Sequence, residues 1–560
     1  MSDAISTRAG EWPLRPWALA TLLGVAGLLV HLASDWDYGE MVPWRAALTG
    51  FVFFGPLALA FTLDRADWKQ PLAFALIVGT VMAGIAWRVA SAEDRFADEG
   101  YWLASGVVAI VLALPLFQAG FHKLRWRTDY EETHYHVWTD AISVAGALAF
   151  TGLSWLLLAL LSELFHAINI DVLRDVMDEE WFGWMFSGTT FGAALGVLRN
   201  QLKIIGTLQS VVMLVFSLVA VPFAAALVIF ILAVLPSGLE VLWSATRSPT
   251  PLLLSCAAAS FVLVNAVVRN NDTEASSNKL LRWTALVLAM AILPLALMAT
   301  VSTGTRIGEY GLSPERIWGL VAIIVAVAYG VAYFIAPIRG KMTHWMERVR
   351  SANMHLAVGT CVLAFLLALP LLNFGAISAR DQLSRLDSGA VTVEDFDFTA
   401  LRWDFGDAGR EALETLTASD DAEIAKLAVE AQEQETRPYR YRDTVPKSER
   451  LANIRVISDD PEMEQRIRDH FEDLDWHCNK PCVLIDTGID EGEQRRVKKV
   501  EERLVSDWLI ARNDEGDGRE RYAVEGTETP LYGPESQVEI REWTGRRIYI
   551  DGEPAGDPFE

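Results

Sequence analysis

The stretch Asn353–Ile377, NMHLAVGTCVLAFLLALPLLNFGAI, divides the chain into two unlike parts. It is 25 residues long and carries no acidic or basic side chain except His355. At a helical rise of about 1.5 Å per residue, such a run crosses a hydrocarbon layer roughly 30 Å thick. Long apolar runs alternate with short polar loops before it, and the chain reads as water-soluble protein after it. Its direction of crossing therefore decides which compartment holds the last third of the chain.

The composition agrees with two parts of different chemistry. The 560 residues are 52% hydrophobic, yet the net charge is −24. Residues 377–560 hold about 25 Lys and Arg against about 45 Asp and Glu, so most of the negative charge lies there. Because acidic protein repels phosphate groups, these features exclude nucleic acid as a partner and indicate the lipid bilayer instead.

The pattern predicts an all-α polytopic membrane helical bundle with a C-terminal soluble α+β domain. We expect the bundle over 1–376, an amphipathic helical segment against the membrane face over 377–436, and an acidic domain over 437–560. Helices are expected because backbone groups need internal partners in lipid. About eleven spans are predicted, at 14–33, 44–63, 71–90, 101–122, 140–166, 183–200, 205–235, 250–268, 282–303, 316–337 and 353–376.

The loop charges predict the orientation. One set of loops carries about 16 Lys and Arg and the other about 7, which places the N-terminus in the cytoplasm. With an odd number of crossings, the C-terminal domain is periplasmic and the protein lies in a bacterial inner membrane. The run 205–235 is long and contains Pro222, and we interpret it as one kinked helix. A hairpin there would reverse every later loop.

Glycines at four-residue spacing mark one face of the sixth span, at Gly188, Gly192 and Gly196. Small residues let helix backbones approach closely in lipid, so a static helix–helix seam is expected. The functional alternative is a sliding surface in a transport cycle.

Three ionisable residues lie near the predicted outer ends of spans. Glu163 and His166 share a helix face, and Arg88 is a candidate partner for Glu163. A cation or proton site is one interpretation, since charges at membrane depth usually serve a function. Anchoring at the interface, with the charged ends reaching water, is the simpler one.

A second charged set lies between spans nine and ten, in RIGEYGLSPERIWGL at 306–320. Arg306, Glu309 and Arg316 can form a cluster at the mouth of the bundle. The simpler interpretation is the start of a helix, with Ser313 as N-cap and Pro314 in the first turn.

Neither metal nor cofactor is expected. His134 and His136 beside Glu131 and Glu132 have no second ligand cluster at a standard spacing, so a solvated loop is expected there. Cys478 and Cys482 are predicted to form a disulfide in an oxidising periplasm, with free thiols or a redox pair as alternatives. Cys256 and Cys361 lie in apolar runs and are read as small hydrophobic residues.

The soluble part is expected to contain a helix at 461–471 and several short strands. The strands are predicted at 454–457, 482–486, 505–512, 520–524, 537–542 and 547–550.

Several stretches resemble the bacterial membrane proteins of domain-of-unknown-function family 4153. They are RIGEYGLSPERIWGL at 306–320, NAVVRN at 265–270, WFGWMFSGTTFGAALGVLR at 181–199 and ISARDQLSRLDSGAVTVEDFDFTALRWDFGDAGREALETL at 377–416. The resemblance spans most of residues 1–417 and implies a polytopic inner-membrane protein with a soluble tail. It implies no reaction, and the tail beyond about residue 440 has no match to the family.

No phosphate-binding loop, zinc HExxH pair or GxSxG nucleophile turn occurs in the chain. An enzymatic role therefore has no recognisable catalytic motif to support it. Three classes remain. The first is an envelope structural or regulatory protein with a periplasmic interaction module. The second is a transporter or channel for a small solute or ion, and the third is a membrane-embedded enzyme with a site at the outer interface. A polar cavity at mid-membrane would favour transport, and a solid bundle would favour the first class.

Overall fold

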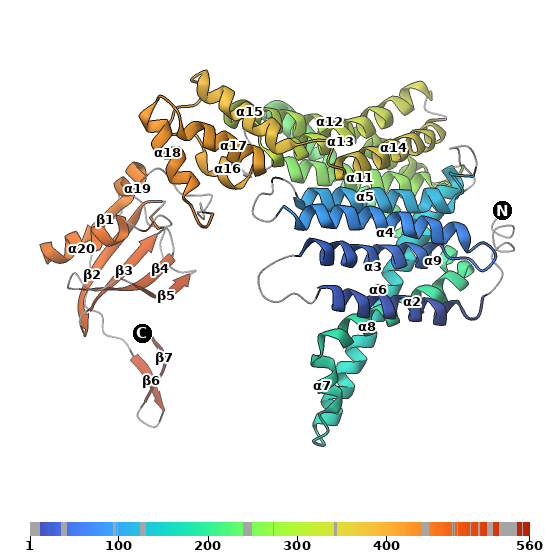
Figure 1. The fold of residues 1–560 in the computed structure, drawn as a ribbon, viewed down its shortest axis with the longest axis horizontal. Coiled ribbons are helices and arrows are strands. Elements are labelled where there is room, and N and C mark those ends of the chain that lie inside the picture. The colour runs from blue at the N-terminus through green and yellow to red at the C-terminus, as the bar shows by residue number, and fades with distance from the viewer. Residues whose placement is uncertain are drawn as a thin grey trace. The chain divides into compact units, whose positions relative to one another are not determined.

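The chain divides into two compact units, Met1–Glu435 and Thr436–Glu560 (Figure 1). The first is almost entirely helical, and the second is built on a small sheet. The computed structural model describes residues 12–34, 42–92, 97, 99–123, 130–238, 249–272, 274–340, 344–437, 447–472, 474, 477–478, 480–492, 494–501, 504–511, 519–525, 546–550 and 553–559.

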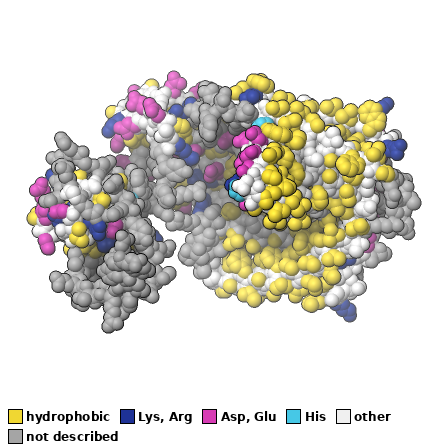
Figure 2. Space-filling model, turned by 90° about the horizontal axis from the view of Figure 1, so that it is seen from below, with side chains coloured by type: hydrophobic (Ala, Val, Ile, Leu, Met, Phe, Trp, Pro, Cys, Tyr) yellow, Lys and Arg dark blue, Asp and Glu magenta, His cyan; other side chains and the backbone are white. Residues whose placement is uncertain are grey.

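The first unit contains the helices of the bundle. They are α2 (Arg15–Ser34), α3 (Pro43–Thr62), α4 (Lys69–Ala90), α5 (Glu99–Gln118), α6 (Tyr130–His166), α7 (Val172–Asp178), α8 (Glu180–Asn200), α9 (Leu202–Ser237), α11 (Pro249–Val268), α12 (Lys279–Tyr310), α13 (Pro314–Arg339) and α14 (Trp345–Ala368). Among the described residues, ten helices are long and apolar enough to cross a membrane. Apolar side chains cover much of the bundle face seen in Figure 2, as expected of a surface in contact with lipid. The protein is therefore a multi-pass membrane protein.

Ten of the eleven predicted spans correspond to these ten helices. The predicted span 183–200 forms α8, which is not among them. Its sequence is rich in glycine, serine and threonine, and α8 runs antiparallel along α2 with this small-residue face buried against it. The odd number of crossings depends on α8 and remains a prediction. Helix α9 continues through Pro222 as one helix, so no hairpin interrupts 205–235.

The largest hydrophobic core of the bundle lies around α12. Along α12, Leu288, Ala289 and Leu295 are fully buried, and α9, α11, α13 and α14 contribute the other side chains of this cluster. Four shorter helices follow the last span, namely α15 (Phe374–Asp387), α16 (Phe398–Trp403), α17 (Gly406–Thr417) and α18 (Ala422–Gln432). They share a separate core that includes Leu401 and Leu413, so they form a small helical layer of their own.

The second unit is an α+β module. It contains α19 (Lys447–Asn453), β1 (Ile454–Ile457), α20 (Pro461–Glu472), β2 (Cys482–Glu491), β3 (Gln494–Glu501), β4 (Leu504–Ala511), β5 (Arg519–Glu525), β6 (Arg546–Ile550) and β7 (Glu553–Phe559). Strands β1 to β5 form one sheet in sequence order, with β1 parallel to β2 and the other pairs antiparallel, while β6 and β7 form a separate pair. Met463, Ile467 and Phe471 of α20 pack on the sheet beside Trp508. Strands β3 and β7 had not been predicted, and the predicted strand 537–542 lies outside the described residues.

Candidate functional site

The turn between α12 and α13 is held by α15. Three side chains of α15, Asp381, Gln382 and Arg385, bind the backbone of this turn, and we call them the α15 clasp. Because the last carbonyl groups of a helix have no partner within it, the clasp serves as a cap for α12. Gln382 Nε2 donates to the carbonyl oxygens of Tyr310 and Leu312 (both 2.9 Å), Arg385 donates to those of Gly308 (3.2 Å) and Glu309 (2.7 Å), and the Leu312 N–H donates to Asp381 Oδ2 (2.7 Å).

Gly311 makes this approach possible. Its φ is +71°, a backbone conformation that residues other than glycine rarely adopt. A Cβ at this position would lie 2.6 Å from Gln382 Nε2 and 2.9 Å from Asp381 Oδ2. The turn thus joins two of the stretches that carry the family resemblance, 306–320 and 377–416, through direct hydrogen bonds.

The predicted charged cluster at this turn is only partly assembled. Arg316 is half-buried, and its Nη1 donates to the carbonyl oxygens of Tyr310 (3.1 Å) and Gly311 (2.7 Å). Arg306 and Glu309 have exposed side chains. Ser313 accepts a hydrogen bond from the Arg316 N–H and caps α13, with Pro314 in its first turn, as the sequence predicts. Arg316 therefore stabilises the end of α12, whereas Arg306 and Glu309 remain at the surface.

Arg88, Glu163 and His166 do not meet. The Arg88 guanidinium lies 3.4 Å from the centroid of the Trp102 ring and donates to the Ala368 carbonyl oxygen at 3.2 Å. Glu163 is exposed, and His166 contacts Asp171 at 2.5 Å. Among the described residues no ion pair joins Arg88 to Glu163, so the structure offers no site built from these three.

A buried polar ring instead links four helices. We define the polar ring as Tyr130 of α6, Asn265 of α11, Tyr333 of α13 and Asn353 of α14. Asn265 and Asn353 are 6% exposed and Tyr333 is fully buried. Asn353 Nδ2 donates to Asn265 Oδ1 (2.7 Å) and the Tyr130 hydroxyl (3.4 Å), Tyr333 donates to Asn353 Oδ1 (2.6 Å), Asn265 Nδ2 donates to the Tyr333 hydroxyl (2.8 Å), and Tyr130 donates to Asn265 Oδ1 (3.2 Å).

The ring uses every donor that its side chains possess. The second hydrogen on Asn265 Nδ2 goes to the Phe261 carbonyl oxygen at 2.8 Å. Each hydroxyl donates once and accepts at least once, and both amide nitrogens donate twice. A satisfied polar network rigidifies the groups that it joins. The ring therefore holds α6, α11, α13 and α14 in one fixed arrangement.

Polar contacts around the ring brace it further. Arg350, 8% exposed, donates to the carbonyl oxygen of Val268 at 2.8 Å and to Asp272 at 2.7 Å. His134, which the sequence placed in a solvated loop, is 7% exposed. Its ring contacts Asn270, and Trp138 Nε1 donates to its Nε2 at 3.1 Å. The prediction of a solvated loop is wrong because α6 begins at Tyr130, within the bundle.

No local sequence pattern marks the residues of the polar ring. Its residues are separated by 20 to 223 positions, and each one alone resembles an ordinary polar residue near a span end. Asn265 and Asn353 had appeared only within longer stretches, one in NAVVRN and one at the start of the last span. Only the packing of the four helices brings them together.

The glycine face of α8 lies directly on the backbone of α2. A Cβ at Gly188 would be 2.2 Å from the Leu23 oxygen, and one at Gly192 would be 2.3 Å from the Leu19 oxygen. A Cβ at Gly196 would lie 2.5 Å from Pro16 Cα. These distances describe a close-packed seam along most of α2.

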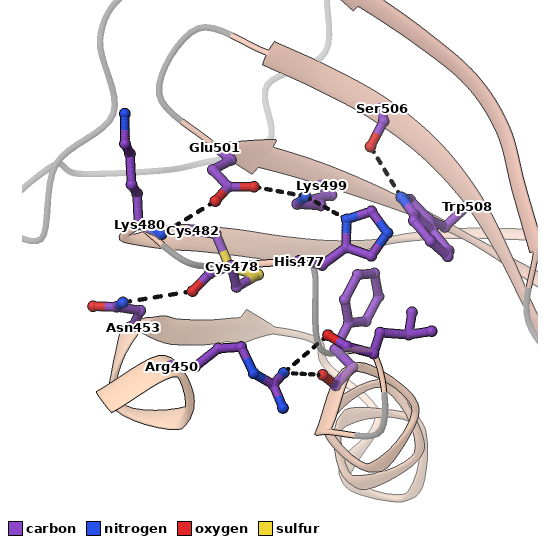
Figure 3. The surroundings of a disulfide bond; sticks show 12 residues. Arg450, Asn453, His477, Cys478, Lys480, Cys482, Lys499, Glu501, Ser506 and Trp508 are labelled. Carbon is purple, nitrogen blue, oxygen red and sulfur yellow. Dashed lines mark hydrogen bonds and ion pairs between the residues drawn. A yellow bond between two sulfur atoms is a disulfide. The ribbon is translucent and has the colours of Figure 1, made fainter. Parts of the chain in front are cut away.

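The module contains a disulfide between Cys478 and Cys482, and both cysteines are fully buried (Figure 3). Glu501 accepts a hydrogen bond from the Lys480 N–H at 3.2 Å, inside the disulfide loop. Asn453 Nδ2 contacts the Cys478 carbonyl oxygen at 3.5 Å. The loop is thus tied to β3 on one side and to α19 on the other.

His477 precedes the disulfide and faces Lys499 (Figure 3). Lys499 is 3% exposed and lies 2.9 Å from His477 Nδ1 and 2.7 Å from Glu501. Burial, together with the positive charge of Lys499, lowers the pKa of His477 to about 3. The neutral imidazole therefore accepts a hydrogen bond from Lys499, and the carboxylate of Glu501 balances the buried ammonium.

An apolar pocket of about 320 Å³ lies between α11, α12 and α13. Its lining includes Leu254, Phe261, Ile292 and Tyr329. In the part of the chain that the structure describes, no three His, Cys, Asp or Glu side chains lie together as a metal site would require. The ring, the clasp and the pocket thus offer no recognisable catalytic constellation.

Comparison with known proteins identifies one family. The family model described as "Domain of unknown function (DUF4153)" matches residues 46–416, which include the polar ring, α8 and the α15 clasp. No curated protein and no solved structure matches the chain. The chain is an integral membrane protein that belongs to the DUF4153 family.

Proposed function

We propose that this protein is a structural or regulatory component of the cell envelope, anchored in the inner membrane. In this proposal the bundle is a static anchor. Its last span carries the acidic module into the periplasm, where the module binds a protein partner.

The closed polar ring is the observation that carries the proposal. A transport site would present polar groups that are free to bind a solute. The hydrogen-bond donors of the ring are already bonded within the protein, almost all of them to other ring residues. The pocket of about 320 Å³ is lined by apolar side chains. Both features favour a bundle that holds one arrangement over one that alternates between two.

The α15 clasp supports the anchoring role. It joins the chain that leaves the last span to the α12–α13 turn through five hydrogen bonds. The helical layer α15–α18 therefore begins from a fixed point on the bundle. An anchor for an interaction module needs such a rigid exit, because mobility would add an entropic cost to partner binding.

The orientation is tested by reporters fused after Glu560. Alkaline phosphatase fused there should be active, and a green fluorescent protein that matures only in the cytoplasm should be dark. A matched pair fused after Ala66, in the loop between α3 and α4, should show the reverse. Fluorescence from the Glu560 fusion would contradict the periplasmic module.

Partner binding is tested by site-specific photocrosslinking in living cells. Ile489 is 49% exposed and is the most exposed large apolar side chain described in the module. A photoreactive residue at Ile489 should yield a discrete crosslinked product that is absent when it replaces Gln465, an exposed residue of α20. Identical products, or none, at the two positions would contradict a partner surface near Ile489.

A further inference from the structure

Besides Thr139 Oγ1, three buried side-chain oxygens of α5 and α6 have no hydrogen-bond partner among the described residues. They belong to Gln118, the last residue of α5, and to Asp140 and Ser143 of α6. Gln118 Nε2 donates to the Phe61 carbonyl oxygen at 3.0 Å and to Asp140 Oδ1 at 3.3 Å. Gln118 Oε1, Asp140 Oδ2 and Ser143 Oγ remain unpartnered among the described residues.

Two of these residues are in direct contact, and the third lies about one helical turn further along α6. Gln118 is bonded directly to Asp140, and Ser143 lies three positions after Asp140 on the same face of α6. Ser143 is 1% exposed. Buried polar atoms almost always have a partner, and leaving one without any is costly. Several unpartnered oxygens around one carboxylate therefore point to a ligand that accepts their lone pairs.

The carboxylate itself lacks a contact cation. No ion pair within the described residues joins Asp140 to a basic side chain. Arg199 and His136 lie near enough to act on its charge, but Arg199 Nη1 donates to the Ala60 carbonyl oxygen at 2.5 Å. A charge buried in this way calls for a counter-ion held by the oxygens themselves.

The donor set defines the class of ligand. One carboxylate, one amide oxygen and one hydroxyl are hard oxygen donors, which suit hard cations and not soft metals. Calcium and magnesium sites usually gather more negative charge than one carboxylate provides. We propose that Gln118, Asp140 and Ser143 form a binding site for one sodium ion, a role that goes beyond the anchoring function proposed above.

The test is direct binding of radioactive sodium to the purified full-length chain in lipid nanodiscs. We expect saturable retention of about one Na⁺ per chain, which excess unlabelled Na⁺ displaces and choline does not. Asp140→Asn should weaken binding by roughly tenfold or more, because the neutral amide removes the only negative charge among the ligands. Ser143→Ala should weaken it less, and Glu163→Gln, which changes an exposed carboxylate of the same helix, should leave it unchanged.

The outcomes separate the alternatives. Absence of saturable binding in the wild type, or equal binding in the wild type and Asp140→Asn, overturns the proposal. If Asp140→Asn does not fold, Ser143→Ala decides, and unaltered affinity in that variant overturns it. If the infrared carboxyl signal responds to pH but not to Na⁺, the site binds a proton. If the site holds only ordered water, no Na⁺ is retained. Either result refutes a sodium site.

Discussion

The contact between α8 and α2 provides the sharpest test of the bundle. In Gly192→Ala, the new Cβ would lie 2.3 Å from the Leu19 oxygen and 2.7 Å from the Leu19 carbon. Both are backbone atoms, so no side chain can rotate away. Relief requires the two helices to separate by about 1 Å, because carbon–oxygen contacts below about 3 Å are repulsive. Overpacking of this kind costs about 1–3 kcal/mol, and we expect the upper end here.

A matched control exists on the same helix. A Cβ at Gly183 would have no neighbour within 4 Å, so Gly183→Ala should be neutral or slightly stabilising. At roughly 2–4 °C per kcal/mol for domains of moderate size, Gly192→Ala should lower the midpoint of thermal unfolding in detergent by roughly 5 °C or more. Equal midpoints for Gly192→Ala, Gly183→Ala and the wild type would refute the close-packed seam.

Three further predictions concern the ring, the clasp and the module. Tyr333→Phe removes a hydroxyl from the ring and should lower the free energy of unfolding by about 1–3 kcal/mol, seen as a lower thermal midpoint. An unchanged midpoint would show that the ring does not hold the helices together. Gly311→Ala should speed tryptic cleavage within 374–435 relative to Gly308→Ala, where a Cβ meets nothing within 4 Å; equal rates would contradict the clasp. The pKa of His477 is about 3 when folded and about 6.5 when unfolded, so between these values only the unfolded state binds the proton. The stability of the module, measured by proteolysis in urea, should therefore fall as the pH is lowered from about 6.5 towards 3. The fall should be less steep in His477→Asn, and parallel pH profiles of the two proteins would argue against a buried neutral imidazole.

Much of the architecture could be predicted from local patterns. Ten of the eleven predicted spans coincide with apolar helices, because burial in lipid requires an unbroken apolar run, and such a run is visible in the sequence. The start of α13 at Ser313 was equally visible, since a cap depends on neighbouring residues. The regular spacing of Gly188, Gly192 and Gly196 marked a packing face, although the partner helix α2 could not be named.

Strand β3 shows where local patterns fail. Its sequence, QRRVKKVE, carries four basic residues in eight and resembles a solvated loop. In the structure, Lys499 is buried against His477 and Glu501, and Lys498 pairs with Asp507 of β4 at 2.6 Å. A charged side chain enters a strand when folding sets an opposite charge against it. Here Glu501 comes from β3 itself, and Asp507 comes from β4, nine positions after Lys498.

The sequence by itself determined that the chain spans a membrane many times, because a run of apolar residues long enough to cross lipid needs no distant partner. It also determined where α13 begins and which face of α8 carries small residues. Only the tertiary structure decided which polar side chains meet, since the polar ring and the clasp draw on helices far apart in the chain and the Asp140 cluster depends on how α5 packs against α6. Hydrogen bonds have a reach of about 3 Å, so such sites exist only once the helices have packed.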